Sequence, residues 1–238
     1  MGLYRDQGVV LRTYRLGEAD RIVTFVTAAH GKVRAVAKGV RKTKSRFGAR
    51  LEPTSHVSLL LYEGRELDIV TQAEGVEQFR VVREDLERFA RASAMLEAVD
   101  QVSQERQSNP RLYQMLVGAL RALSARDAPL LLPAFFLKLL SLEGFHPRLD
   151  ECASCGSTSE LVGFDLAQGG ALCRACGRGP RVGPEALTLL RRMLGGDLAS
   201  VLNEPPSPVA FEVGMLATRA LEHHLERRLR SVAVLDRA

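Results

Sequence analysis

The spacing of apolar residues along the chain changes near residue 80. Before that point, apolar and polar positions alternate in short runs rich in β-branched residues, which is typical of half-buried strands. After it, apolar residues recur every three or four positions, as on the buried stripe of a helix. The pattern therefore predicts a β-rich domain over residues 1–80 and an α-helical domain over residues 81–238.

Several short segments of the first domain are predicted strands. They cover residues 8–14, 21–27, the run from Gly31 that Gly39 breaks, 56–62 and 67–71, with a hairpin turn at 63–65. Five short strands in about 75 residues suit a small barrel, and the five-stranded OB-fold is the first candidate. An SH3-like barrel is the main alternative, because strand count alone does not separate the two.

The second domain is predicted to be a compact set of amphipathic helices. They begin near Val82, at Asn109-Pro110, near Leu130, at Gly183-Pro184 and near Pro208. Asn109 followed by Pro110 is a capping residue before a proline at the first helical position. The buried face of the first helix is predicted to carry Leu86, Phe89, Ser93, Leu96 and Val99.

Charge is concentrated at one end of the chain. The first 50 residues hold 12 Lys/Arg and 3 Asp/Glu, whereas the other 188 hold 21 and 25. No acidic residue lies between Asp20 and Glu52. The basic side chains of this window follow a predicted strand and then a loop, while Val33, Ala35 and Ala37 face the other way. These side chains are Lys32, Arg34, Lys38, Arg41, Lys42, Lys44, Arg46 and Arg50.

Like charges at this density repel one another, and a bound polyanion neutralises them most simply. A solvated loop that only aids solubility is the alternative. The segment is borne on a strand and has no acidic partner nearby in sequence, which favours nucleic-acid binding. We therefore predict that these eight basic residues contact nucleic acid. The charge pattern alone does not distinguish DNA from RNA.

The cysteines form a second candidate site. Cys152-x-x-Cys155 and Cys173-x-x-Cys176 are separated by 17 residues, a spacing typical of four-cysteine zinc sites. The apolar segments between the pairs suit a hairpin, so we predict a zinc ribbon at about residues 148–181, inserted in the helical domain. Four thiolates leave no position for water, which predicts one structural Zn²⁺ per chain. Two disulfides or a dithiol redox centre are the disfavoured alternatives.

No enzyme motif is present in the sequence. Gly31-Lys32 lacks the upstream glycine of a phosphate-binding loop, and the motifs HExxH and G-x-S-x-G are absent. The carboxylates are too scattered along the chain to hold the two metals of a nuclease. The longest apolar run, residues 129–142, is broken by Pro133 and Lys138 and is too short to span a bilayer. We predict a cytoplasmic protein without catalytic activity or membrane association.

The N-terminal residues resemble, in order, those of the bacterial recombination mediator RecO family. The matching segments are Gly8-Val9-Val10-Leu11, Gly17-Glu18-Ala19-Asp20-Arg21, Phe25, Gly31, Ala37-Lys38-Gly39-Val40-Arg41-Lys42, Ser45-Arg46-Phe47 and Leu51-Glu52-Pro53. The resemblance extends to Gly144-Phe145-His146-Pro147, Leu149 and the first cysteine pair, where many family members carry a zinc module.

The resemblance implies an N-terminal OB-fold that binds single- and double-stranded DNA, with contacts at the basic positions from Lys38 to Arg46. It also implies loading of RecA on gapped DNA, together with RecR and single-strand-binding protein. Annealing of complementary strands is expected because a basic face lowers the repulsion between them. Such a protein would be cytoplasmic and associated with the nucleoid when on DNA. Two other functions fit the same residues: an RNA-binding OB-fold protein, or a zinc-stabilised scaffold whose basic face binds an acidic protein tail.

Overall fold

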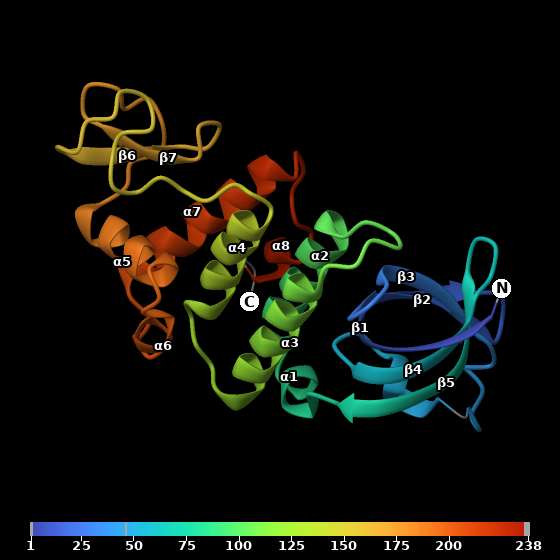
Figure 1. The fold of residues 1–238 in the computed structure, drawn as a ribbon. Coiled ribbons are helices and arrows are strands. Elements are labelled where there is room, and N and C mark those ends of the chain that lie inside the picture. Colours follow the sequence, from blue (N-terminus) through green and yellow to red (C-terminus); the bar gives the residue numbers. More distant parts are fainter. Residues whose placement is uncertain (1, 46, 236–238) are drawn as a thin grey trace. The chain divides into compact units, whose positions relative to one another are not determined.

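The computed structural model describes residues 2–45 and 47–235. The chain forms two compact units. The first contains the described residues up to Ala125 and from Arg230 onward, and the second spans Arg126–Leu229. Figure 1 shows the barrel at the start of the chain, the helices that follow and the small β6–β7 hairpin. The predicted α+β organisation is confirmed.

The β-rich part of the first unit is a closed barrel. Its strands are β1 (Leu3–Leu16), β2 (Asp20–Thr27), β3 (Gly31–Ala37), β4 (His56–Tyr62) and β5 (Asp68–Glu77). The strands follow the order β1-β2-β3-β5-β4, and the long strand β1 closes the barrel by pairing with β4 as well as β2. Strands β3 and β5 run parallel, and the other neighbours are antiparallel. The predicted OB-like barrel is therefore confirmed.

Alternation along the strands fills the barrel. Val33, Ala35 and Ala37 of β3 are fully buried, as the sequence pattern predicts, and they pack with Phe25 of β2. Phe47 and Leu51 also lie in this core, so the chain returns to the barrel through the 3₁₀ helix Gly48–Leu51. The basic segment is thus anchored in apolar packing at both of its ends.

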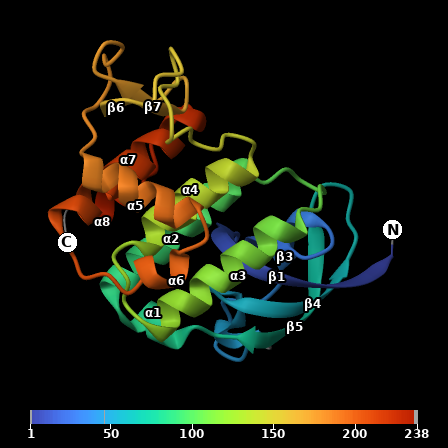
Figure 2. The same cartoon turned by 60° about the vertical axis from the view of Figure 1, so that its left-hand side comes forward.

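Helices pack beside the barrel in the first unit. They are α1 (Arg80–Glu84), α2 (Leu86–Val102), α3 (Pro110–Ala125) and α8 (Val232–Leu235). Asn109 caps α3 as predicted, because its Oδ1 accepts a hydrogen bond from the Leu112 backbone N at 3.1 Å. Helix α2 lies against β1, and α3 lies against β1 and β2. Figure 2 shows α3 running beside the barrel. Leu86 is wrongly predicted as buried: it is the first residue of α2, just after the Asp85 cap, and is 69% exposed.

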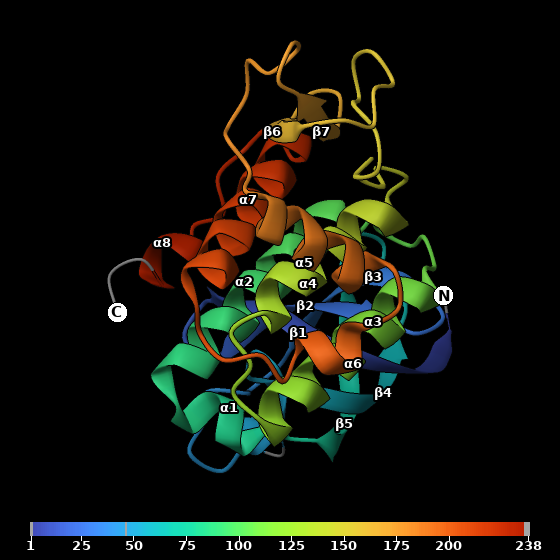
Figure 3. The same cartoon turned by 90° about the vertical axis from the view of Figure 1, so that its left-hand side faces the viewer.

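The second unit is helical with one inserted hairpin. Its elements are α4 (Leu131–Leu142), β6 (Leu161–Asp165), β7 (Gly170–Cys173), α5 (Pro184–Leu194), α6 (Leu198–Val201) and α7 (Pro208–His224). The apolar helix α4 is its centre and packs against α7 and α5. Figure 3 shows the β6–β7 hairpin beyond the end of α7. Gly144, with φ of +91°, follows the end of α4.

The helices that follow the barrel are shared between the two units. Helices α2 and α3 have their contacts in the barrel unit, whereas α4, α5 and α7 make up the second unit. A domain boundary at residue 80, with residues 81–238 as one helical domain, stays a proposal. Among the described helices, none is both long enough and apolar enough to cross a membrane.

Candidate nucleic-acid interface and metal centre

The basic side chains of the barrel differ in how they are held, and Lys32 is the most constrained. Its Nζ donates to the Asp100 backbone O at 2.7 Å and lies 3.5 Å from the Asp100 carboxylate. That carboxylate is 6% exposed and also pairs with Arg12 Nε at 2.9 Å. A buried carboxylate is costly without cationic partners. Lys32 and Arg12 therefore tie β3 and β1 to the end of α2.

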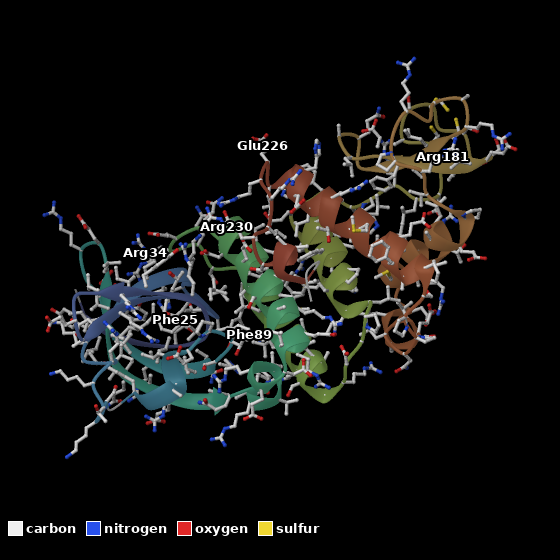
Figure 4. All side chains as sticks on the ribbon, turned by 180° about the vertical axis from the view of Figure 1, so that it is seen from behind. Phe25, Arg34, Phe89, Arg181, Glu226 and Arg230 are labelled. Atoms are coloured by element: carbon white, nitrogen blue, oxygen red, sulfur yellow. The ribbon has the colours of Figure 1, made fainter. Side chains whose placement is uncertain are left out.

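Arg34 is half-buried and Arg41 is exposed, and both have partners. Arg34 points outward from β3 (Figure 4) and lies 3.5 Å from Glu105, with the two side chains 40% and 54% exposed. Such exposed pairs contribute little to stability, so a phosphate can compete for Arg34. Arg41 donates to the Glu18 carbonyl O at 2.8 Å while its side chain stays on the surface. Both remain candidates for contact with a polyanion.

The loop after β3 presents the most accessible cations. Lys38, Lys42 and Lys44 are exposed, and within the described part of the chain their side chains make no ion pair. Arg50 is exposed as well, whereas Arg46 lies outside the described residues. We define Lys38, Arg41, Lys42 and Lys44 as the cationic loop.

The base of the cationic loop is braced by the β1–β2 turn. The Asp20 carboxylate accepts a hydrogen bond from the Gly39 backbone N at 2.7 Å. The Arg41 backbone N donates to the Ala19 O at 3.0 Å. Gly39 has φ of +67°, a conformation that favours glycine. The carboxylate of Asp20 is thus bound to the backbone of the loop, and this contact fixes the base of the cationic loop.

The acidic partners of β3 come from a distant part of the chain and were not predicted from the sequence. The window around Lys32 and Arg34 is free of acid along the chain, yet Asp100 and Glu105 approach it from the end of α2 and beyond. Residues 104–107 run alongside β3, with Lys32 N donating to Gln104 O and Arg106 N donating to Lys32 O. These contacts join residues about 70 positions apart, which a local charge count does not reveal.

The four cysteines meet at the β6–β7 hairpin. Their Sγ atoms all lie within 4.8 Å of one another, and those of Cys155 and Cys173 are 3.7 Å apart. Four thiolates around one tetrahedral Zn²⁺, with bonds of about 2.3 Å, would be about 3.8 Å apart. All four cysteines are free thiols, so the structure contains neither of the two alternative disulfides. The arrangement fits a single metal ion held by sulfur.

Hydrogen bonds of the two turns set the positions of the sulfurs. Gly156, with φ of +76°, donates its N–H to the Cys152 O at 2.9 Å, and Cys176 N donates to Cys173 O at 3.1 Å. The backbone N–H of Cys173 is the main cause that lowers the pKa of the Cys152 thiol. Neighbouring thiols, first that of Cys155, raise the pKa of Cys176.

These opposed shifts mark a site where one thiolate is favoured and further negative charge is disfavoured. A dication satisfies all four sulfurs together, because metal-bound cysteines are deprotonated. Four thiolates would fill the shell of a tetrahedral ion and leave no position for water or substrate. The chemistry of the donor set therefore points to a structural metal site.

Both parts of the chain match one family. Residues 1–79 match the family model described as Recombination protein O N terminal, and residues 83–233 match Recombination protein O C terminal. The chain is also 44% identical over 244 residues to DNA repair protein RecO of Frankia casuarinae, and the match covers 100% of each chain. The barrel, the helices and the cysteine hairpin all fall within these matches. The chain therefore belongs to the RecO family of DNA repair and recombination proteins.

Proposed function

We propose that the protein is a recombination mediator that binds single- and double-stranded DNA, anneals complementary strands and helps to load RecA on gapped DNA. Membership of the RecO family supports the role in repair. The observation that carries the DNA-binding part is the exposed cationic loop on an OB-like barrel. By family resemblance, RecR and single-strand-binding protein are the proposed partners, in the cytoplasm and at the nucleoid.

The proposed mechanism is physical and involves no covalent step. Phosphates that bind to the cationic loop and to Arg50 release condensed counterions, which drives association. Arg34 is paired with Glu105, so it joins these contacts only if a phosphate displaces that carboxylate. A strand whose charge is partly neutralised repels its complement less strongly, so pairing is faster. Lys32 contributes mainly by holding β3 against α2.

We also propose that the four cysteines hold one Zn²⁺ in a structural role. Cys152, Cys155, Cys173 and Cys176 would supply four thiolates at the spacing that zinc requires. The metal would fix the two turns of the hairpin to each other. Because the shell would be complete, no chemical step passes through the ion.

The test is annealing of complementary single strands that are coated with single-strand-binding protein. The intact protein should accelerate annealing. A variant with Lys38, Lys42 and Lys44 changed to Ala should lose most of this acceleration, because these three side chains have no competing ion pair among the described residues. Filter-binding or fluorescence titrations of the same variant should show weaker binding to both single-stranded and duplex DNA.

A matched control removes the same charge elsewhere. Arg80, Arg111 and Arg219 are exposed arginines on α1, α3 and α7, and changing them to Ala lowers the net charge equally. This control should anneal like the intact protein. Absence of annealing by the intact, metal-loaded protein would refute the proposal. Tighter binding of RNA than of DNA of equal length would favour the RNA-binding alternative, and negligible binding of both would favour the protein scaffold.

A further inference from the structure

The outer face of the barrel carries a continuous row of apolar and aromatic side chains. Strand pairing places them side by side around the barrel, in the order Tyr14, Ile22, Val36, Ile69, Tyr62 and Leu3. They point outward because the residues next to them along the strands, such as Val23, Ala35 and Val70, fill the core. We call these six residues the outer row.

Most outward positions nearer to α2 and α3 are covered, whereas the outer row is at least partly open to solvent. Thr24 and Val26 also point outward from β2, yet they are 0% and 1% exposed, because α2 and α3 pack on this part of the barrel. In the outer row, Tyr14 is 51% and Tyr62 41% exposed, whereas Ile22, Val36 and Ile69 are half-buried. Within the described residues of this unit, the row is therefore a partly exposed apolar strip that is most accessible at its tyrosines and at Leu3.

The two ends of the outer row differ in charge. At the β1–β3 end, Arg15 follows Tyr14 and Lys38 lies two residues beyond Val36, at the start of the cationic loop. Arg34 lies on the same face of β3 as Val36. At the β4 end, Tyr62 is followed by Glu63, Arg65 and Glu66, so positive and negative charges are mixed there. The β1–β3 end thus combines an aromatic side chain with the larger excess of positive charge, which suits a negatively charged ligand that has flat apolar parts.

The ring of Tyr14 is held in place by a chain of contacts from the protein interior. The Arg12 guanidinium lies 5.0 Å from the centre of the Tyr14 ring and donates a hydrogen bond to its hydroxyl. Arg12 in turn is fixed by its ion pair with the buried Asp100. A ring whose orientation is set before binding loses less conformational entropy when a ligand stacks on it.

We propose that Tyr14, Ile22 and Val36 form a platform for the unpaired bases of single-stranded DNA, next to the phosphate-binding cationic loop. This inference rests on the proposed function, and it assigns the part of the site that tells single strands from duplex. Bases of a single strand can stack on an aromatic side chain, with little dependence on sequence. In a duplex the bases are already stacked on one another, so a duplex reaches only the cationic loop.

The test compares the affinities of single-stranded and duplex DNA of equal length for variants of Tyr14. Tyr14→Ala should weaken single-strand binding by about 5- to 100-fold, the usual effect of removing one stacking side chain. Duplex binding should change by less than about twofold, because phosphate contacts are unaffected. Tyr14→Phe keeps the ring and loses only the hydroxyl, so it should retain most of the single-strand affinity.

Tyr62→Ala is the matched control, because Tyr62 is a similarly exposed tyrosine of the same row at its β4 end, away from the cationic loop. It should leave both affinities unchanged. The platform would be overturned if Tyr14→Ala and Tyr62→Ala lost the same affinity for single-stranded DNA. It would also be overturned if Tyr14→Ala lost as much affinity for duplex as for single-stranded DNA.

If Tyr14→Ala bound single-stranded DNA as tightly as the intact protein, and binding still depended on Lys38, Lys42 and Lys44, the platform would be overturned but the proposed function would stand. Failure of the intact protein to bind DNA would overturn both.

Discussion

At the scale of single residues, position in the fold decides what a basic side chain can do. Lys32 and Lys42 lie in the same acid-free stretch of sequence. The Lys32 side chain is 15% exposed and bound to Asp100, whereas Lys42 is exposed on the cationic loop. The first is held by the protein, and the second is free to be neutralised by a ligand.

Lys32→Met should therefore act on stability and not on DNA binding. The change leaves the buried Asp100 with Arg12 as its remaining cation, so the free energy of unfolding should fall by about 1–3 kcal/mol. Urea unfolding measures this loss, and a titration of the folded variant should give a DNA affinity within about twofold of the intact protein. Lys42→Met, the matched change, should show the reverse. A stable Lys32→Met protein with weak DNA binding would contradict this assignment.

Buried His56 links stability to pH. Its Nε2 lies 2.7 Å from the Tyr113 hydroxyl, and its Nδ1 lies 3.3 Å from Glu77, which Arg121 also holds. An ionised carboxylate can only accept, so a neutral ring donates from Nδ1 to Glu77 and accepts from Tyr113 at Nε2. Burial is the main cause that lowers the pKa of His56 below its ordinary value of 6.5.

The sign of the pH effect follows from this lowered pKa. Below about pH 6.5 the unfolded chain takes up a proton on His56 that the folded protein does not. The free energy of unfolding should therefore fall as the pH drops from about 6.5 toward the lowered pKa, by up to about 1.4 kcal/mol per pH unit. Urea unfolding between about pH 5.5 and 7.5 measures the slope, and His56→Gln should flatten it. An unchanged slope in the variant would show that other groups cause it.

At the scale of elements, alternation and helical spacing were enough to predict most of the fold. The strands of the barrel and the positions of helices α3 and α4 follow from residue periods, because burial on one side is a local property of the pattern. Leu86 was mispredicted because the period does not say where the packed part of a helix begins. The contact of Lys32 with Asp100 and the exposure of Tyr14 were not predicted, since both depend on where α2 and α3 lie against the barrel.

The cysteine hairpin, residues 152–176 with strands β6 and β7, should depend on its metal for stability. Its strands β6 and β7 bury few apolar side chains, chiefly Phe164 and Leu172, so the metal should supply much of its stability. Elemental analysis should find one zinc per chain. Cys173→Ser, or removal of zinc by a chelator, should lower the melting temperature by about 4 °C or more, the shift expected if about 2 kcal/mol is lost.

The barrel should be insensitive to this change, because its core contains no residue of the hairpin. DNA affinity of the zinc-depleted protein, measured below its melting temperature, should match that of the intact protein. Ser159→Ala, an exposed serine of the same hairpin, is the control and should alter neither quantity. Loss of DNA binding with an unchanged melting temperature would instead place the DNA site on the hairpin.

At the scale of the whole molecule, the distribution of charge matters more than its sum. The net charge of +5 is modest, but the first 50 residues hold 12 of the 33 basic side chains and only 3 of the 28 acidic ones. Several of those cations already form ion pairs within the protein, with Asp100, Glu52 and Glu105. The number of phosphates bound should therefore be smaller than the number of basic residues in the segment.

The dependence of affinity on salt counts these phosphates. Lys38, Arg41, Lys42, Lys44 and Arg50 are the exposed basic positions among the described residues between β3 and β4. If each neutralises one phosphate of a single strand, a plot of log affinity against log salt should have a slope of about −3.5. Changing Lys42 and Lys44 to Ala should reduce the slope to about −2, whereas Tyr14→Ala should lower affinity at every salt concentration and leave the slope unchanged. A slope near zero for the intact protein would remove the electrostatic mechanism. A slope near −5.6, the value for eight phosphates, would mean that Lys32, Arg34 and Arg46 bind phosphates as well.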